Sequence, residues 1–183
     1  MINLFNRKAL QDTIMVGGSA FRIHTDYRIW IRFVHEYETW DKKGTLDISY
    51  LFMDDMPGFC ERKDYKEIFD FAYPKNDCPH GDDCGISERI LDYKVDSDYI
   101  YAAFLSQYNI DLIEIEYLHY HKFKALLNGI SKPTRLYEIM GYRTYSGKDK
   151  DLAHVKQAWA LPELLTDEEK EAEREFNEYF GCQ

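Results

Sequence analysis

The stretch from Glu116 to Ile130, EYLHYHKFKALLNGI, decides the class of fold that the sequence predicts. Apolar side chains recur in it at intervals of three and four residues, which is the spacing of one helix face. The residues expected on the inward face are His119, Phe123, Leu126, Leu127 and Ile130. We therefore interpret this stretch as an amphipathic helix that packs against a helical core.

Three further helices are predicted upstream of this one. Thr25 is expected to cap the first, the second runs from Glu61 to about Ala72, and Asp96 is expected to cap the third. Asn109 interrupts the third helix. The apolar faces of the first and third helices are Ile29, Trp30, Phe33, Val34 and Tyr37, and Tyr99, Ile100, Ala103, Phe104 and Tyr108.

Three more helices are predicted downstream. Pro133 suits the first turn of one helix, Ser146 caps the next, and Leu161-Pro162 ends that one. The apolar faces are Leu136, Tyr137, Ile139 and Met140 in one helix, and Leu152, Val155 and Trp159 in the next. Thr166 then opens a capping box, and an acidic helix follows with only Ala172, Phe176 and Phe180 on its apolar stripe.

A β-hairpin is predicted near the N-terminus, at about residues 12–24. Apolar residues alternate on both sides of Gly17-Gly18, a pair that suits the positive φ angles of a two-residue hairpin turn. The predicted fold is thus mainly α, with one helical domain over residues 1–162 that includes this hairpin. Residues 163–183 are predicted to form an acidic C-terminal helix or tail.

The composition limits the classes of function. No apolar stretch is long enough to cross a bilayer and the N-terminus shows no signal peptide, so we expect a cytoplasmic protein that does not enter membranes. The net charge of −10 disfavours nucleic acid as a partner. Tyr and Phe are abundant, and this favours a core with further aromatic side chains available to a partner.

The charge is unevenly distributed near the C-terminus. Residues 119–156 hold eight Lys or Arg and three Asp or Glu, whereas residues 157–183 hold two and eight. The basic segment is expected to attract the acidic end, either within one chain or from a neighbouring copy. Self-association is therefore predicted.

Cys60, Cys78, His80 and Cys84 raise the question of a zinc site. No two of these cysteines have the two-residue gap of a zinc knuckle, so we predict no bound metal. The residues from Pro74 to Gly85 are interpreted as an exposed polar loop, and the cysteines as reduced thiols.

No set of residues proposes a reaction. His119 and His121 lie near Glu114 and Glu116, but residues two apart on a regular helix point about 200° from each other and cannot share one metal ion. We expect one histidine in the core and the other at its rim. No phosphate-binding loop or nucleophile elbow is present. The sequence predicts a protein that is not an enzyme, with no cofactor.

Lysines and arginines alternate with aromatic residues between Lys122 and Lys148, a mixture that can bind single-stranded nucleic acid. The alternative places those aromatic residues in the core and the basic residues on a solvated face. We favour this alternative, because the negative net charge repels phosphate.

Three ordered blocks carry a resemblance to a known family. They are Asp96–Leu112, Leu118–Leu127 and Glu138–Arg143, with Phe21–Trp30 fitting the start of the family and Trp159–Pro162 its end. Together they resemble the phage gene-product-fifteen family over about residues 12–162. His121 stands where the family leads us to expect an aromatic residue, and the Cys78–Cys84 loop looks like an insertion.

The resemblance implies a role in phage tail morphogenesis, inside the host cell cytoplasm. Such genes typically precede the gene for the tape-measure protein, which is the position of tail assembly chaperones. We expect a chaperone that binds the tape-measure protein and other tail proteins without nucleotide, with Tyr120, Tyr137 and Trp159 as exposed contacts. The alternatives are a structural component of the tail and a zinc- or nucleic-acid-binding regulator.

Overall fold

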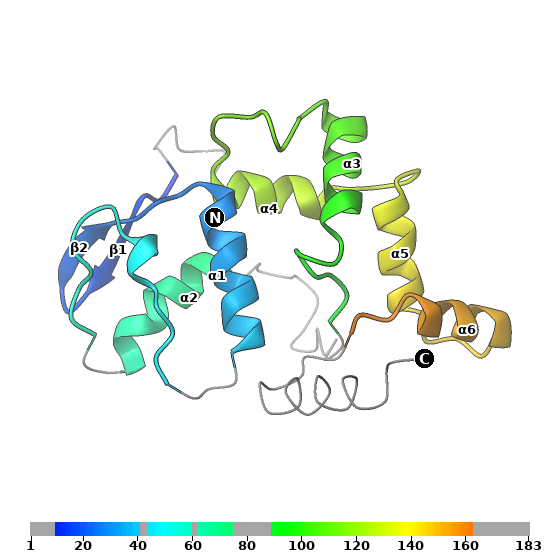
Figure 1. The fold of residues 1–183 in the computed structure, drawn as a ribbon, viewed down its shortest axis with the longest axis horizontal. Helices are drawn as coiled ribbons and strands as arrows, with labels where there is room; N and C mark the ends of the chain where they lie inside the picture. The colour runs from blue at the N-terminus through cyan, green and yellow to red at the C-terminus, as the bar shows by residue number, and fades with distance from the viewer. Residues whose placement is uncertain (1–9, 41–43, 60–61, 75–88, 163–183) are drawn as a thin grey trace, which may run out of the picture.

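A computed structural model of the chain describes residues 10–40, 44–59, 62–74 and 89–162 (Figure 1). These residues form a two-stranded hairpin and six α-helices. The strands are β1 (Thr13–Val16) and β2 (Ser19–Arg22), and the α-helices are α1 (Tyr27–Thr39), α2 (Lys66–Ala72), α3 (Ser97–Tyr108), α4 (Tyr120–Asn128), α5 (Arg135–Arg143) and α6 (Lys150–Ala158). Two short 3-10 helices are η1 (Ser49–Leu51) and η2 (Arg62–Tyr65). The predicted class, mainly α with an N-terminal hairpin, is confirmed. The predicted acidic helix lies outside the described residues.

The hairpin forms as its sequence predicts. Its strands pair antiparallel, and Gly17 and Gly18 occupy the turn with φ angles of +57° and +86°. Positive φ at both turn residues gives a twist that matches the strands, and glycine adopts it without strain. Ile14 and Val16 on β1 are buried, so one face of the hairpin covers the core.

The helices form an elongated molecule in which α4 lies between two groups of elements (Figure 1). The hairpin, α1 and α2 lie at one end, and α5 and α6 at the other. The segment before α4 runs antiparallel to the start of α1, because Tyr27 N donates to Leu118 O at 2.9 Å and Tyr120 N donates to Thr25 O at 2.8 Å. Residues about ninety positions apart are thereby joined by backbone hydrogen bonds.

Aromatic rings carried by α4 pack against α1 and α2 on one side and against α3 on the other. Tyr120 stacks near Trp30 and Phe71, with ring centroids 5.9 and 6.0 Å away. One turn later, Phe123 stacks between Tyr27 at 4.7 Å and Phe104 at 5.1 Å. The stretch that decides the fold class thus supplies side chains to the core on both sides of α4.

Several predicted helix starts are wrong by one to four residues. Asp26 caps α1 in place of Thr25, because its carboxylate accepts from Arg28 N at 3.0 Å, while the Thr25 hydroxyl is bonded to Tyr117 Oη at 2.7 Å. The helix expected from Glu116 begins at Tyr120, where α4 starts.

Two later caps also differ from the prediction. Pro133 lies before α5 and not in its first turn, since Thr134 Oγ1 accepts from Tyr137 N and caps the helix. Asp149 replaces Ser146 as the cap of α6 and accepts from Asp151 N at 2.9 Å. None of the residues of α6 is fully buried and Leu152 is 38% exposed, so the inward face expected for this helix is only partly formed, by the half-buried Val155 and Trp159.

Asp96 occupies the expected cap position of α3, but its side chain makes no cap hydrogen bond. The carboxylate instead forms two hydrogen bonds with Arg143, at 2.6 and 2.9 Å, and the exposed fractions of the two side chains are 1% and 6%. Arg143 also donates to Ile90 O at 3.0 Å and Trp159 O at 2.7 Å. One buried guanidinium therefore joins the residues before α3, the end of α5 and the end of α6.

Candidate protein-binding groove

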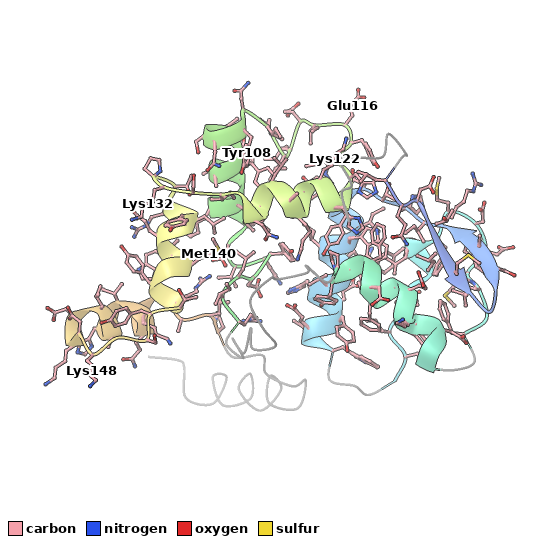
Figure 2. All side chains as sticks on the ribbon, turned by 180° about the vertical axis from the view of Figure 1, so that it is seen from behind. Tyr108, Glu116, Lys122, Lys132, Met140 and Lys148 are labelled. Atoms are coloured by element: carbon pink, nitrogen blue, oxygen red, sulfur yellow. The ribbon has the colours of Figure 1, made fainter. Side chains whose placement is uncertain are left out.

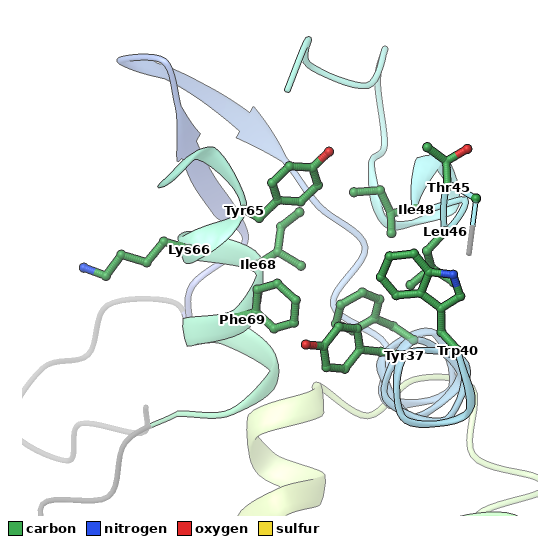
Figure 3. A pocket seen from close by; sticks show the side chains of 11 residues that line it. Tyr37, Trp40, Thr45, Leu46, Ile48, Tyr65, Lys66, Ile68 and Phe69 are labelled. Carbon is green, nitrogen blue, oxygen red and sulfur yellow. The ribbon is translucent and has the colours of Figure 1, made fainter. Parts of the chain in front are cut away.

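An open, largely apolar groove of about 910 Å³ lies between α1 and α2 (Figure 3). One wall is the C-terminal half of α1 with Trp40, the other is Tyr65 with the start of α2, and residues 44–48 close one side. Aromatic side chains from both walls point toward each other across it. The aromatic lining consists of Phe33, Tyr37, Trp40, Tyr65 and Phe69.

Helical spacing explains how these rings come to line one hollow. Phe33 and Tyr37 are four residues apart on α1, and Tyr65 and Phe69 are four apart where η2 leads into α2. The Tyr37 and Phe69 rings meet edge to face at 4.8 Å across the groove. Because Phe33 is 2% exposed whereas Tyr37 and Tyr65 are 37% and 38% exposed, the groove has a buried floor and an accessible aromatic rim.

The groove is suited to apolar contacts rather than to chemistry. Lys66 is the one charged side chain among its described lining residues, and it lies within 3.8 Å of Asp70 on the same helix. The other polar side chains of the lining are Thr45, Tyr37 and Tyr65 with their hydroxyls and Trp40 with its indole N–H. An apolar floor with a few polar groups at the rim is typical of a surface that recognises an apolar partner.

Tyr120, predicted as an exposed contact, does not reach the surface. Its side chain is 0% exposed and its hydroxyl donates to Ala72 O at 2.8 Å. Burial raises the pKa of Tyr120 well above the usual value for a tyrosine. The expectation of an exposed Tyr120 is therefore wrong, because α4 starts at this residue and directs it between α1 and α2.

The other two predicted contacts lie on α5 and at the end of α6. Tyr137 is 39% exposed, with Lys132 Nζ 5.9 Å from its ring. Trp159 is half-buried and packs edge to face against Tyr99 at 6.0 Å, with the Arg135 guanidinium 4.9 Å from its ring. Neither residue lines the groove, and their role as partner contacts stays a prediction.

Both histidines considered as metal ligands are buried, each at 4% exposure. His119 Nδ1 accepts from His121 N at 3.0 Å, and its Nε2 donates to Gln11 O. His121 Nε2 donates to Phe71 O at 3.0 Å, and burial lowers the pKa of His121 to about 4. The expectation of one core and one rim histidine is wrong, since His119 precedes the helix as its cap and the 200° separation does not apply.

The described residues contain no group of three or more His, Cys, Asp or Glu side chains placed to hold a metal ion. The Cys60 and Cys78–Cys84 positions lie outside the part of the chain that the structure describes. No helix among the described ranges is long and apolar enough to cross a membrane.

The fold and the groove define a mainly α-helical protein with an aromatic-rimmed hollow between α1 and α2. Residues 10–164 match the model of a known family, described as Bacteriophage Gp15 protein. The chain belongs to this family, and the predicted resemblance is confirmed over nearly the same residues. Comparison with curated proteins and with solved structures gives no match.

Proposed function

We propose that this protein is a phage tail assembly chaperone whose aromatic groove holds an apolar helical segment of the tape-measure protein. The observation that carries the proposal is the open groove between α1 and α2, with Tyr37 and Tyr65 accessible at its rim. Membership of a bacteriophage family supplies the biological setting. Binding is passive in this proposal and requires neither nucleotide nor another cofactor.

The lining indicates the chemistry of the segment that would fit. A helix that binds in a groove presents apolar anchors at intervals of three and four residues, and the volume of about 910 Å³ suits several such side chains. Aromatic rims contribute large contact areas with few rotatable bonds, which limits the entropy lost on binding. Lys66, which is 71% exposed at the rim, favours a segment that carries an acidic residue beside its apolar face.

Co-expression with fragments of the tape-measure protein tests the proposal. Fragments that are insoluble alone are expected to become soluble and to co-purify with the wild-type chain. Tyr37→Ser and Tyr65→Ser each remove one rim ring, and we expect recovery of the fragment to fall at least about fivefold, as for loss of an interface aromatic residue.

Tyr137→Ser is the comparison variant, because Tyr137 is exposed to the same degree, lies outside the groove and is the competing predicted contact. Normal recovery with Tyr137→Ser and poor recovery with the groove variants would support the groove. The reverse pattern would place the contact on α5. Fragments that stay insoluble, or become soluble without association, would overturn the chaperone function.

The alternative of a structural tail component is tested on purified phage particles. A chaperone leaves the tail before it is complete, so mass spectrometry of particles should not detect this chain. A stoichiometric amount in the particle would favour the structural component.

A further inference from the structure

The end of the molecule formed by residues 132–159, which we call the basic arm, is packed into the body through α5, where Leu136 and Ile139 are each 0% exposed. It comprises α5, α6 and the segments beside them, and in Figures 1 and 2 it extends away from the hairpin end. In α6 none of the nine residues is buried. The helix is anchored at its ends, by Asp149 N donating to Tyr145 Oη at 2.9 Å and by Arg143 Nε donating to Trp159 O at 2.7 Å.

The exposed charges of the basic arm are predominantly positive. Its lysines and arginines are Lys132, Arg135, Arg143, Lys148, Lys150 and Lys156, of which Arg143 is buried against Asp96. Two of its acidic side chains are engaged within the arm: Glu138 pairs with Arg135 at 2.7 Å, and Asp149 caps α6. Lys148 and Lys150 lie exposed at the start of α6, and Figure 2 shows Lys148 at the outer end of the molecule.

An opposite charge is available in the same chain. Residues 163–183 contain eight Asp or Glu and two Lys or Arg, and their apolar residues include Leu164, Leu165, Phe176 and Phe180. The exposed face of α6 offers Leu152 beside Lys150, whereas Val155 is half-buried. A segment with acidic and apolar residues is complementary to a helix that exposes both lysines and aliphatic side chains.

The route of the chain favours the arm of another copy over the chain's own arm. After α6 the chain returns toward the body (Figure 1), where Arg89 Nη2 donates to Pro162 O at 2.6 Å. Arg89 in turn pairs with the buried Asp92 at 3.3 Å, just before α3. The chain therefore enters residues 163–183 from a fixed point beside α3, away from the outer end of α6 where Lys148 lies.

We propose that the acidic segment 163–183 of one copy binds the basic arm of a second copy, so that two copies exchange their C-terminal segments across a twofold axis. Such an exchange is reciprocal and closes at two chains, which limits assembly to a dimer. It covers the face of α6 that one chain leaves unburied. It does not depend on the aromatic groove.

Sedimentation velocity of the full chain over a range of protein concentrations tests this proposal. We expect a monomer–dimer equilibrium that weakens as salt rises from about 0.1 to about 1 M, because the screening length falls from about 10 to about 3 Å. Lys148→Glu/Lys150→Glu is expected to weaken the dimer at least about tenfold. Lys94→Glu, an exposed reversal outside residues 119–159, serves as the control and should leave the equilibrium unchanged.

A charge exchange makes the test specific for the two surfaces. Glu168→Lys/Glu171→Lys should also weaken the dimer, and mixing these chains with the Lys148→Glu/Lys150→Glu chains should restore it. The dimer proposal fails if the wild-type chain is a monomer at all concentrations. A monomer whose shape changes with salt would mean that the acidic segment binds the arm of its own chain, and this outcome also contradicts the dimer. The proposal also fails if the arm reversal abolishes binding of a single-stranded oligonucleotide while leaving the oligomeric state unchanged, because the arm would then be a nucleic-acid surface.

Discussion

The buried pair of Asp96 and Arg143 allows a prediction whose size follows from the structure. We consider the variants Asp96→Ala and Arg143→Met, which remove one partner each. The Asp96 side chain makes no cap hydrogen bond to α3, so Asp96→Ala removes no helix cap. The effect of this substitution therefore reports on the ion pair and on the hydrogen bond that Asp92 N donates to Asp96 Oδ2 at 2.9 Å.

The two variants should differ in cost. Breaking a buried ion pair by removing one partner costs about 3–5 kcal/mol, since the other charge is left without compensation. After Asp96→Ala, Arg143 keeps its hydrogen bonds to Ile90 O and Trp159 O but Asp92 N loses its acceptor, so we expect about 4 kcal/mol. Arg143→Met leaves the Asp96 carboxylate with Asp92 N as its donor. It also removes the donor to Ile90 O and Trp159 O, at roughly 1 kcal/mol for each carbonyl, so we expect the free energy of unfolding to fall by about 5 kcal/mol. Either loss is a large part of the roughly 5–15 kcal/mol that stabilises a typical domain.

Urea unfolding followed by circular dichroism measures these free energies. The double variant Asp96→Ala/Arg143→Met contains no unpaired buried charge, and its cost should fall short of the sum of the single costs by several kcal/mol. Glu138→Ala is the control, because it breaks an Arg–carboxylate contact of 2.7 Å whose side chains are 50% and 43% exposed. Such exposed pairs contribute about 0–1 kcal/mol.

The reasoning would be refuted if Asp96→Ala and Arg143→Met destabilised the protein no more than Glu138→Ala does. It would also be refuted if the costs of the two single substitutions were additive in the double variant. Either outcome would mean that the short contacts of Arg143 do not contribute to the stability of the folded chain.

Three other features give predictions. Because burial lowers the pKa of His121 to about 4 from 6.5, the unfolded chain binds a proton between these pH values that the folded chain does not. The free energy of unfolding should fall as pH drops from 6.5 to 4, and His121→Phe should make the fall in urea midpoint shallower; equal slopes would contradict this. Gly18→Val forces a β-branched residue to φ +86° and should cost at least about 1 kcal/mol in the same urea assay, whereas an unchanged midpoint would argue against the turn. Asp149→Ala removes the cap of a helix with no buried residue, so trypsin should cut after Lys150 faster while the urea midpoint stays constant; a lower midpoint would show that α6 stabilises the whole domain.

The periodicity of apolar residues predicts most of the fold. The faces around Trp30, Phe104 and Phe123 are buried as expected, since burial of large side chains dominates the stability of each helix. Helix starts were less predictable, because neighbouring polar residues compete for the cap. Thr25 and Asp26 are both residue types that cap helices. The Thr25 hydroxyl forms a hydrogen bond with Tyr117 Oη, 92 positions away, and this contact cannot be read from the local sequence.

The candidate site was less accessible from the sequence. Tyr37 lies on a predicted apolar helix face, which indicates burial, and Tyr65 lies within a predicted helix. Only the packing of α1 against α2 leaves both rings at the rim of a hollow. A pair of aromatic residues four apart in each of two helices, Phe33 with Tyr37 and Tyr65 with Phe69, is the signal that could have indicated it. The Asp96–Arg143 pair was also missed, because a cap-type residue and an arginine 47 positions apart carry no sign of their contact.

The antiparallel bridge between the start of α1 and the start of α4 has a consequence for synthesis on the ribosome. The Thr25 hydroxyl and Tyr117 are 92 positions apart, and ribosomes add about 5–20 residues per second. Roughly 5–20 seconds therefore pass after α1 is made before its backbone partners exist. During that interval Trp30 lacks Tyr120, one of the rings that cover it in the folded chain. The N-terminal third of the nascent chain must wait for residues 118–120 before its native packing is complete.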